Sequence, residues 1–106
     1  MLYDTPNTEN SPVQFRDKYD NFINGEWVAP VDGEYFDNLS PIDGKTICQV
    51  ARSKEADIEK ALDAAHAAKD AWGKTSVTER ANLLLKIADK MEENLEAIAI
   101  AECYEN

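Results

Sequence analysis

Hydrophobic and polar residues alternate over short stretches in the first half of this chain and recur at helical spacing in the second half. Residues 22–28 place aromatic and β-branched side chains on both sides of Asn24 and Gly25. An Asn-Gly pair favours the type I′ turn, whose two central residues both need a positive φ. Because aromatic and β-branched side chains favour strands, the stretch predicts a β-hairpin centred on this pair.

A second hairpin is predicted from two strand-like stretches, 35–39 and 46–51, which are joined by turn-forming residues that include Pro41. Together the two hairpins occupy residues 21–52. Such short strands need a partner sheet or a helix in order to be stable. Residues 1–20 are polar, contain two prolines and show no periodicity, so they are expected to form an irregular N-terminal arm.

Two long antiparallel helices are predicted over residues 53–73 and 76–106, because apolar side chains recur there every three to four residues. Ser53 is a suitable N-cap for the first helix. The second helix begins with a capping box, in which the side chains of Ser76 and Glu79 each accept a hydrogen bond from the backbone of the other. The pattern therefore predicts an α+β architecture of two short hairpins followed by two helices.

The second predicted helix is apolar on more than one side, because Leu83 and Ile100 lie away from its main stripe. A helix with two apolar faces usually lies between two layers, and the first helix can cover only one of them. No base follows Lys90, and acids such as Glu105 lie near the negative end of the helix dipole. We therefore expect the chain to be the front part of a longer protein that continues beyond Asn106.

Composition narrows the function classes. The 106 residues carry a formal charge of −10, which argues against binding to nucleic acid or to an anionic membrane surface. No apolar run is long enough to span a bilayer, and the start does not resemble a signal peptide. The two cysteines, Cys48 and Cys103, lack metal-binding spacing, so a reduced, cytoplasmic protein is expected.

No catalytic constellation is evident in the sequence. Cys48 lies in a strand pattern, and Cys103 lies among acids, an environment unlike that of a reactive thiol. His66 is the only histidine and has no partner at helical spacing that would make it a base or a ligand. Trp27 and Trp72 are predicted to be packing residues, since no polar cluster accompanies either indole.

Several ordered segments resemble one family. They are Phe-Ile-Asn-Gly-Glu-Trp-Val at 22–28, Phe-Asp-Asn-Leu-Ser-Pro-Ile-Asp-Gly at 36–44, Ala-Trp at 71–72, Glu-Arg-Ala at 79–81, Leu-Lys-Ile-Ala-Asp at 85–89 and Ala-Glu-Cys-Tyr-Glu-Asn at 101–106. In this order they resemble the N-terminal segment of the NAD(P)-dependent aldehyde dehydrogenases, with Ser40 where the family usually has asparagine. The sequences of these segments are most similar to those of the bacterial acetaldehyde and aliphatic aldehyde dehydrogenases.

The resemblance implies that residues 21–106 are an incomplete N-terminal portion of an α/β, Rossmann-like cofactor-binding domain. It also implies a parent enzyme that converts an aldehyde, NAD or NADP and water into a carboxylic acid through a cysteine thiohemiacetal and a thioester. The family's catalytic and dinucleotide-binding residues all follow the position of Asn106. The resemblance therefore assigns no catalytic residue and no cofactor to this segment itself.

One site in the family has a counterpart here. Several aldehyde dehydrogenases hold a structural monovalent cation on backbone carbonyls before the Asn-Pro segment and on an acid near the end of the second helix. By resemblance, these positions correspond to Asn38, Leu39 and Glu105. The alternative is that Glu105 is a solvated acid at the end of a helix.

Two hypotheses follow for the role of the chain. In the first, it is a catalytically inactive, structural segment whose partner is the remainder of the parent chain. In the second, it is a small helical-hairpin interaction module that forms a homo-oligomer, possibly by exchange of its second helix. Under both, the uncovered apolar faces predict that the chain self-associates when it is alone.

Overall fold

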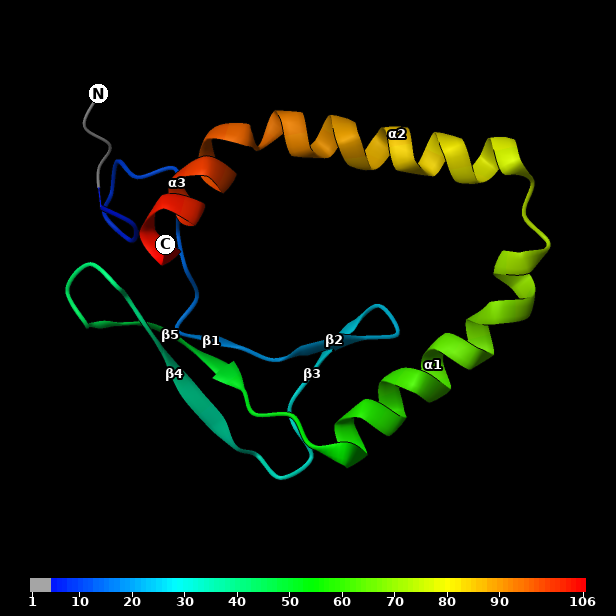
Figure 1. The fold of residues 1–106 in the computed structure, drawn as a ribbon, viewed down its shortest axis with the longest axis horizontal. Coiled ribbons are helices and arrows are strands. Elements are labelled where there is room, and N and C mark those ends of the chain that lie inside the picture. Colours follow the sequence, from blue (N-terminus) through cyan, green and yellow to red (C-terminus); the bar gives the residue numbers. More distant parts are fainter. Residues whose placement is uncertain (1–4) are drawn as a thin grey trace. The chain divides into compact units, whose positions relative to one another are not determined.

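The computed structural model describes residues 5–106, and Figure 1 gives the order of its strands and helices along the chain. The described chain divides into two compact units. The first unit contains residues 5–15, Leu39–Lys45 and Ser76–Asn106, and the second contains Arg16–Asn38 and Thr46–Thr75. The predicted arm is irregular over 5–15, as expected, and its residues 1–4 lie outside the described part.

The prediction of an irregular arm is wrong near its end, where β1 (Lys18–Tyr19) forms a short strand. This strand pairs in parallel with β5 (Thr46–Ala51), with Lys18 opposite Gln49 and Tyr19 opposite Val50. β4 (Tyr35–Leu39) lies on the other side of β5, which gives a three-stranded sheet in the order β1-β5-β4. A parallel pair between residues so distant in sequence has no local turn signal that would reveal it.

The hairpin predicted around Asn24 is confirmed. β2 (Asn21–Ile23) pairs antiparallel with β3 (Glu26–Val28) as a separate two-stranded sheet. Asn24 and Gly25 have φ values of 53° and 79°, as a type I′ turn requires. The cross-strand pair Phe22–Trp27 packs its rings edge to face, with centroids 5.2 Å apart.

The second predicted hairpin also forms, with β4 and β5 as its arms. Its connection is closed by two backbone hydrogen bonds, from the Ser40 N–H to the Lys45 carbonyl and from the Gly44 N–H to the Ser40 carbonyl, both 2.8 Å. Further along, the Arg52 N–H donates to the Glu34 carbonyl at 2.9 Å. These bonds join residues in reverse order, so the two arms run antiparallel.

Three helices follow the strands, where the sequence predicted two. They are α1 (Glu55–Gly73), α2 (Val77–Glu93) and α3 (Leu95–Glu105). The single helix predicted over 76–106 is wrong, because it is interrupted at Asn94. There the side-chain amide donates to the Lys90 carbonyl at 2.9 Å, and such local bonds compete with the helical backbone. The antiparallel packing of the first and second predicted helices stays a prediction.

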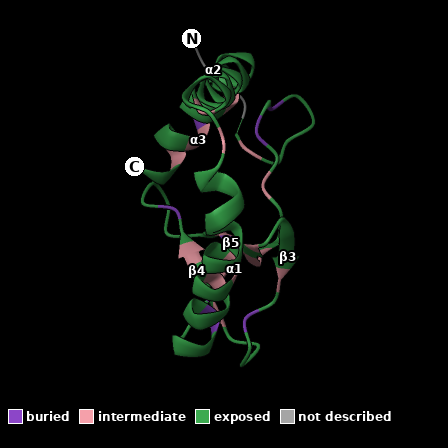
Figure 2. Ribbon diagram, turned by 90° about the vertical axis from the view of Figure 1, so that its right-hand side faces the viewer, coloured by how far each residue is buried: buried purple, intermediate pink, exposed green. Residues whose placement is uncertain are grey.

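Few side chains are buried in either unit. Val13 and Ile100 are buried in the first unit, and Cys48 and Ala51 are buried in the second. Figure 2 shows helices α1 and α2 almost entirely as exposed surface. The described part of the chain therefore has only a thin core of its own.

The capping box predicted at the start of α2 is present. The Glu79 N–H donates to Ser76 Oγ at 3.1 Å, and the Ser76 N–H donates to Glu79 Oε2 at 2.7 Å. The hydrogen bond from the Ser76 backbone lowers the pKa of the Glu79 carboxyl below its ordinary value. The two residues thus satisfy backbone donors that the first turn of a helix leaves open.

Replacing Ser76 with alanine is expected to lower the stability of α2 by about 1 kcal/mol, since the Glu79 N–H loses its acceptor. Urea unfolding followed by far-ultraviolet circular dichroism measures this change. Thr78→Ala is the matched control, because Thr78 is exposed in the same turn and should leave stability nearly unchanged. Equal losses in the two variants would contradict the capping role.

Candidate functional site

The histidine and the two cysteines, which the sequence singled out as candidate catalytic groups, lie on separate elements of the described chain. Among residues 5–106, no three His, Cys, Asp or Glu side chains gather in a way that would hold a metal ion. His66 is exposed on α1. Cys48 is a buried free thiol on β5, and Cys103 is an exposed free thiol on α3.

Of the three residues of the predicted cation site, Asn38 and Leu39 end β4, and Glu105 ends α3. Asn38 belongs to the second unit, is partly buried on β4, and its Nδ2 lies 3.9 Å from Cys48 Sγ. Leu39 and Glu105 belong to the first unit, and the side chains of both are exposed. The cation site stays a prediction.

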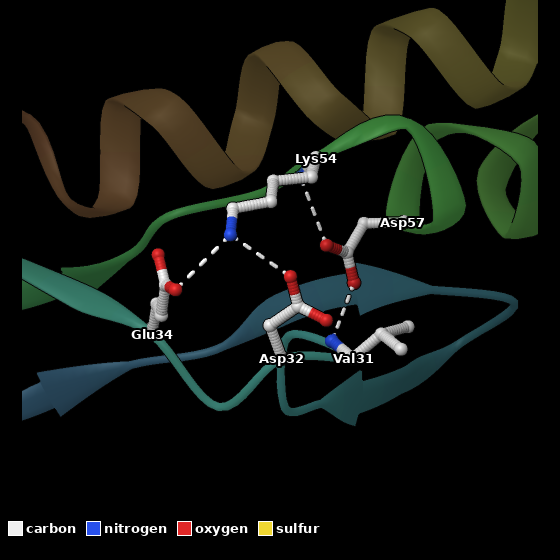
Figure 3. A network of polar contacts seen from close by, with 5 residues as sticks. All are labelled: Val31, Asp32, Glu34, Lys54 and Asp57. Carbon is white, nitrogen blue, oxygen red and sulfur yellow. Dashed lines mark hydrogen bonds and ion pairs between the residues drawn. The ribbon is translucent and has the colours of Figure 1, made fainter.

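A polar network fixes the start of α1 in the second unit (Figure 3). The carboxylate of Asp57, which is only 4% exposed, accepts two backbone hydrogen bonds. One comes from the Val31 N–H at 2.8 Å, and the other comes from the Lys54 N–H at 2.9 Å. These backbone bonds, with that from Lys54 the stronger, lower the pKa of the Asp57 carboxyl.

The side chain of Lys54 completes this network. Its ammonium group lies 2.9 Å from Asp32 Oδ2 and 3.0 Å from Glu34 Oε1, on the segment between β3 and β4 (Figure 3). Hydrogen bonds to these two acids, that to Asp32 the stronger, raise the pKa of Lys54. The network therefore joins the first turn of α1 to the loop that precedes β4.

The network corrects the prediction that Ser53 caps the first helix. Ser53 Oγ instead donates to Asn21 Oδ1 on β2 at 2.8 Å, and the helix begins at Glu55. Capping is supplied from inside the helix by Asp57, which accepts from the Lys54 N–H. The acid in the first turn was noticeable in the sequence, but its second partner, Val31, lies too far away along the chain to be inferred.

Aromatic side chains form a small surface cluster in the second unit. Trp27 contacts Phe22 on the neighbouring strand and Tyr19 on β1, with ring centroids 5.2 Å and 6.4 Å apart. The guanidinium of Arg16 lies over the Trp27 ring at 5.0 Å. Trp27 therefore packs as the sequence predicted, although half of its surface stays exposed, as does half that of Trp72.

An apolar groove lies at the junction of α2 and α3 in the first unit. Its walls are Ile87, Met91 and Ile98, and Lys86 and Lys90 form part of its lining. The three apolar side chains are between 45% and 59% exposed. Monomeric proteins rarely leave such a stripe uncovered, so this groove is a candidate contact surface.

Comparison with protein families identifies the wider context of these features. Residues 27–106 match the Aldehyde dehydrogenase family. The chain belongs to this family. The match begins within β3 and includes both arms of the second hairpin and all three helices.

Individual relatives support the same assignment for this aldehyde dehydrogenase segment. It is 62% identical over 104 residues to an aldehyde dehydrogenase of Deinococcus radiodurans. The aligned region covers 98% of this chain and 20% of the relative. It is 55% identical over 106 residues to an acetaldehyde dehydrogenase of Pseudomonas aeruginosa, which covers 100% of this chain and 21% of the relative. The segment thus spans about a fifth of the length of these relatives and corresponds to their N-terminal part.

A solved structure shows the same arrangement. The NAD+ complex of the aldehyde dehydrogenase from Bacillus cereus matches the segment with a TM-score of 0.80 and 34% identity, over 84% of this chain and 18% of that chain. The α+β fold of small sheets followed by helices is therefore that of the N-terminal part of aldehyde dehydrogenases. No helix among the described residues is both long and apolar enough to cross a membrane.

Proposed function

We propose that this chain forms the N-terminal part of an NAD-dependent aldehyde dehydrogenase and contributes structure to it rather than catalytic groups. The similarity to enzymes named for acetaldehyde and other aldehydes supports oxidation of an aldehyde to a carboxylic acid. NAD is the proposed cofactor because a related structure holds NAD+. When bound, NAD accepts the hydride that the aldehyde loses. Two free cysteines fit the reducing cytoplasm that the sequence favours.

The exposed apolar stripe of α2 and α3 is the observation that carries the structural role. Leu84, Leu95 and Met91 are 67%, 66% and 59% exposed, although they recur at helical spacing. Each such side chain gains about 1.5–3 kcal/mol when it is fully buried. The remaining four-fifths of an aldehyde dehydrogenase is the proposed cover for this stripe, because the relatives are about five times as long as the segment.

The polar network at the start of α1 has a defined part in this role. Through Asp57 and Lys54 it holds the helix at a fixed place relative to the loop before β4. The network thus lets the second unit present α1 and the three-stranded sheet together. We propose that this unit packs against the cofactor-binding domain of the parent enzyme as a preformed piece.

A chimera tests this proposal. The corresponding segment of the P. aeruginosa acetaldehyde dehydrogenase is replaced with this chain. Formation of NADH from acetaldehyde is then followed by the absorbance of the reduced nicotinamide at about 340 nm. The chimera is expected to be active, whereas the chain alone should form no NADH. An insoluble or inactive chimera would contradict the proposal.

The two cysteines provide a sharper test within the same chimera. Because neither Cys48 nor Cys103 is assigned as nucleophile, Cys48→Ser and Cys103→Ser are expected to retain kcat within about twofold, far from the loss of a catalytic thiol. Cys48 is buried, so the melting temperature of its variant is measured alongside kcat. A loss of kcat of about a thousandfold in a variant that is still folded would overturn the assignment.

Self-association is a second proposed activity, and it concerns the chain when it is alone. The groove of Ile87, Met91 and Ile98 supports it, because about half of the surface of each of these side chains is exposed. A second copy of the chain would bury the same stripe that the parent enzyme covers. Sedimentation of the isolated chain distinguishes the oligomer from a monomer.

A further inference from the structure

We propose that Asn24 is a site of spontaneous covalent modification, at which the side-chain amide is lost through a cyclic imide formed with the backbone nitrogen of Gly25. The modified residue is either aspartate or isoaspartate. The inference rests on the sequence of the turn, its exposure and the short strands that flank it. It is independent of the enzymatic activity of the parent protein.

The turn offers the room that this reaction needs. Asn24 and Gly25 are both exposed at the tip of the β2–β3 hairpin. Apart from the two neighbouring residues, no atom lies within 4 Å of the position that a Cβ at Gly25 would take, so no other part of the chain crowds the turn. Glycine is also the residue that least hinders such an approach, because it has no side chain.

The hairpin is also short enough to open. Each strand contains three residues, and the two strands form a sheet of their own. A two-stranded hairpin of this size is marginally stable in water. Local opening releases the backbone of the turn from its φ values of 53° and 79°, and it allows the side chain to reach the following nitrogen.

The chemistry balances with water as the only co-reactant. The Gly25 nitrogen attacks Asn24 Cγ, a C–N bond forms, the nitrogen loses its proton, and ammonia leaves with the side-chain nitrogen. Water then adds to one of the two imide carbonyls and breaks its C–N bond. Opening at Cγ gives aspartate, and opening at the main-chain carbonyl gives isoaspartate, whose backbone contains one additional carbon.

Other residues of the same types are held more firmly. Asn21 and Asn38 are followed by Phe22 and Leu39, whose side chains hinder ring closure, and both lie within strands. Asp43 also precedes a glycine and can form the same imide by losing water. Its carboxylate, however, accepts a hydrogen bond from the Lys45 N–H at 3.0 Å, which holds it away from the following nitrogen.

Asp32, which directly precedes Gly33, is held in a similar way. Its carboxylate forms an ion pair with Lys54 at 2.9 Å. Of the turns at Asn24, Asp32 and Asp43, the turn at Asn24 is therefore the one where both sequence and exposure favour ring closure.

Modification would change how the hairpin meets α1. Asn24, Phe22 and Ile23 line one side of a shallow groove in the second unit, and alanines 61, 64, 65 and 68 of α1 line the other. A longer backbone at the tip disrupts the two-residue turn, and a new carboxylate adds charge beside this apolar surface. We expect the Phe22–Trp27 packing to loosen in the isoaspartate form, with a shift of the tryptophan emission.

The experiment ages the full chain at mildly alkaline pH and follows residue 24 by tryptic peptide mass spectrometry. Trypsin releases Asn21, Asn24 and Asn38 in one peptide, between Lys18 and Lys45, so two internal controls share its conditions. Conversion at Asn24 is expected to be at least about tenfold faster than at either control, because only Asn24 precedes a residue without a Cβ. Labelling by isoaspartyl methyltransferase should detect isoaspartate at this position.

Gly25→Ala separates ring closure from simple opening of the turn. Alanine at a φ of 79° strains and loosens the hairpin, but its Cβ hinders attack by the nitrogen. Conversion that slows in this variant supports the proposal. Conversion that accelerates in it, equal rates at the three asparagines, or formation of aspartate without isoaspartate would each overturn it.

Discussion

Ile87→Asp is expected to weaken the self-association of the isolated chain by at least about tenfold. Full burial of an isoleucine side chain is worth about 1.5–3 kcal/mol, of which the 45% of Ile87 that is still exposed can contribute about half, and a symmetric dimer would lose this contribution twice. Each 1.4 kcal/mol corresponds to about a factor of ten in the dissociation constant. The substitution also places a charge on the apolar groove, which adds to the loss.

Asn82→Asp is the matched control for this prediction. It adds the same charge to α2, but Asn82 is an exposed polar residue outside the groove and lies about 140° around the helix axis from Ile87. Sedimentation over a range of concentrations should give an oligomer for the unsubstituted chain and for the control, and a monomer for Ile87→Asp. A parent chain that stays monomeric at high concentration would refute the proposed self-association.

Asp57→Asn is expected to release the start of α1 from the loop before β4 and to lower the melting temperature by on the order of 5 °C. The carboxylate accepts from two backbone donors, Val31 and Lys54. An asparagine retains one oxygen but presents an amide group to the other donor, which leaves a partly buried N–H without an acceptor. Amide hydrogen exchange at Val31 and Lys54 should therefore become faster.

The pH dependence of stability provides a second readout for Asp57. Because its pKa is lower in the folded chain than the ordinary value of 3.8, folding favours the ionised form. Its stabilising contribution is complete above that value and is lost as the pH falls from 3.8 through the lower folded pKa. The acid-side slope of stability should therefore be shallower in Asp57→Asn, which keeps the parallel contribution of Glu79.

Asp63→Asn serves as the control, because Asp63 is exposed on the same helix and has the same charge. Its variant should keep both the slow exchange at Val31 and the acid-side slope. If the two asparagine variants behave alike, the contacts of Asp57 do not stabilise the start of α1, and the role given to the network is wrong.

Local signals were sufficient for part of the fold. The Asn24-Gly25 pair determines its own turn through positive φ values, and Ser76 and Glu79 form their capping box within a single turn of helix. In both, the residues that interact are neighbours in sequence, so their chemistry is readable from the residues alone. The two hairpins were predicted for this reason.

Contacts between distant residues account for the misses. β1 is a strand only because it lies beside β5, and nothing in Lys18–Tyr19 indicates that partner. The helix predicted over 76–106 has continuous apolar periodicity, yet it is interrupted at Asn94, whose side-chain amide donates to the Lys90 carbonyl. Periodicity does not report such a break, because the apolar side chains keep nearly the same spacing on either side.

The candidate site shows the same division. By resemblance, the sequence predicts that the catalytic groups lie outside this segment, which spans about a fifth of each relative, and this stays a prediction. The network around Asp57 was missed in its main part, since the partner Val31 precedes it by 26 residues. An acid in the first turn of a helix signals a favourable dipole contact, but not the loop that it also holds.

The position of β5 between β1 and β4 has a consequence for how this polypeptide behaves outside its parent. A version that began at Asn21 would lack β1 and would leave the N–H of Gln49, which donates to the Asp17 carbonyl at 2.9 Å, on an open sheet edge. Such an edge is a template for pairing with any other extended peptide. The two-residue strand β1, in an otherwise irregular N-terminal arm, thus protects this edge of β5 from pairing with strands of other molecules.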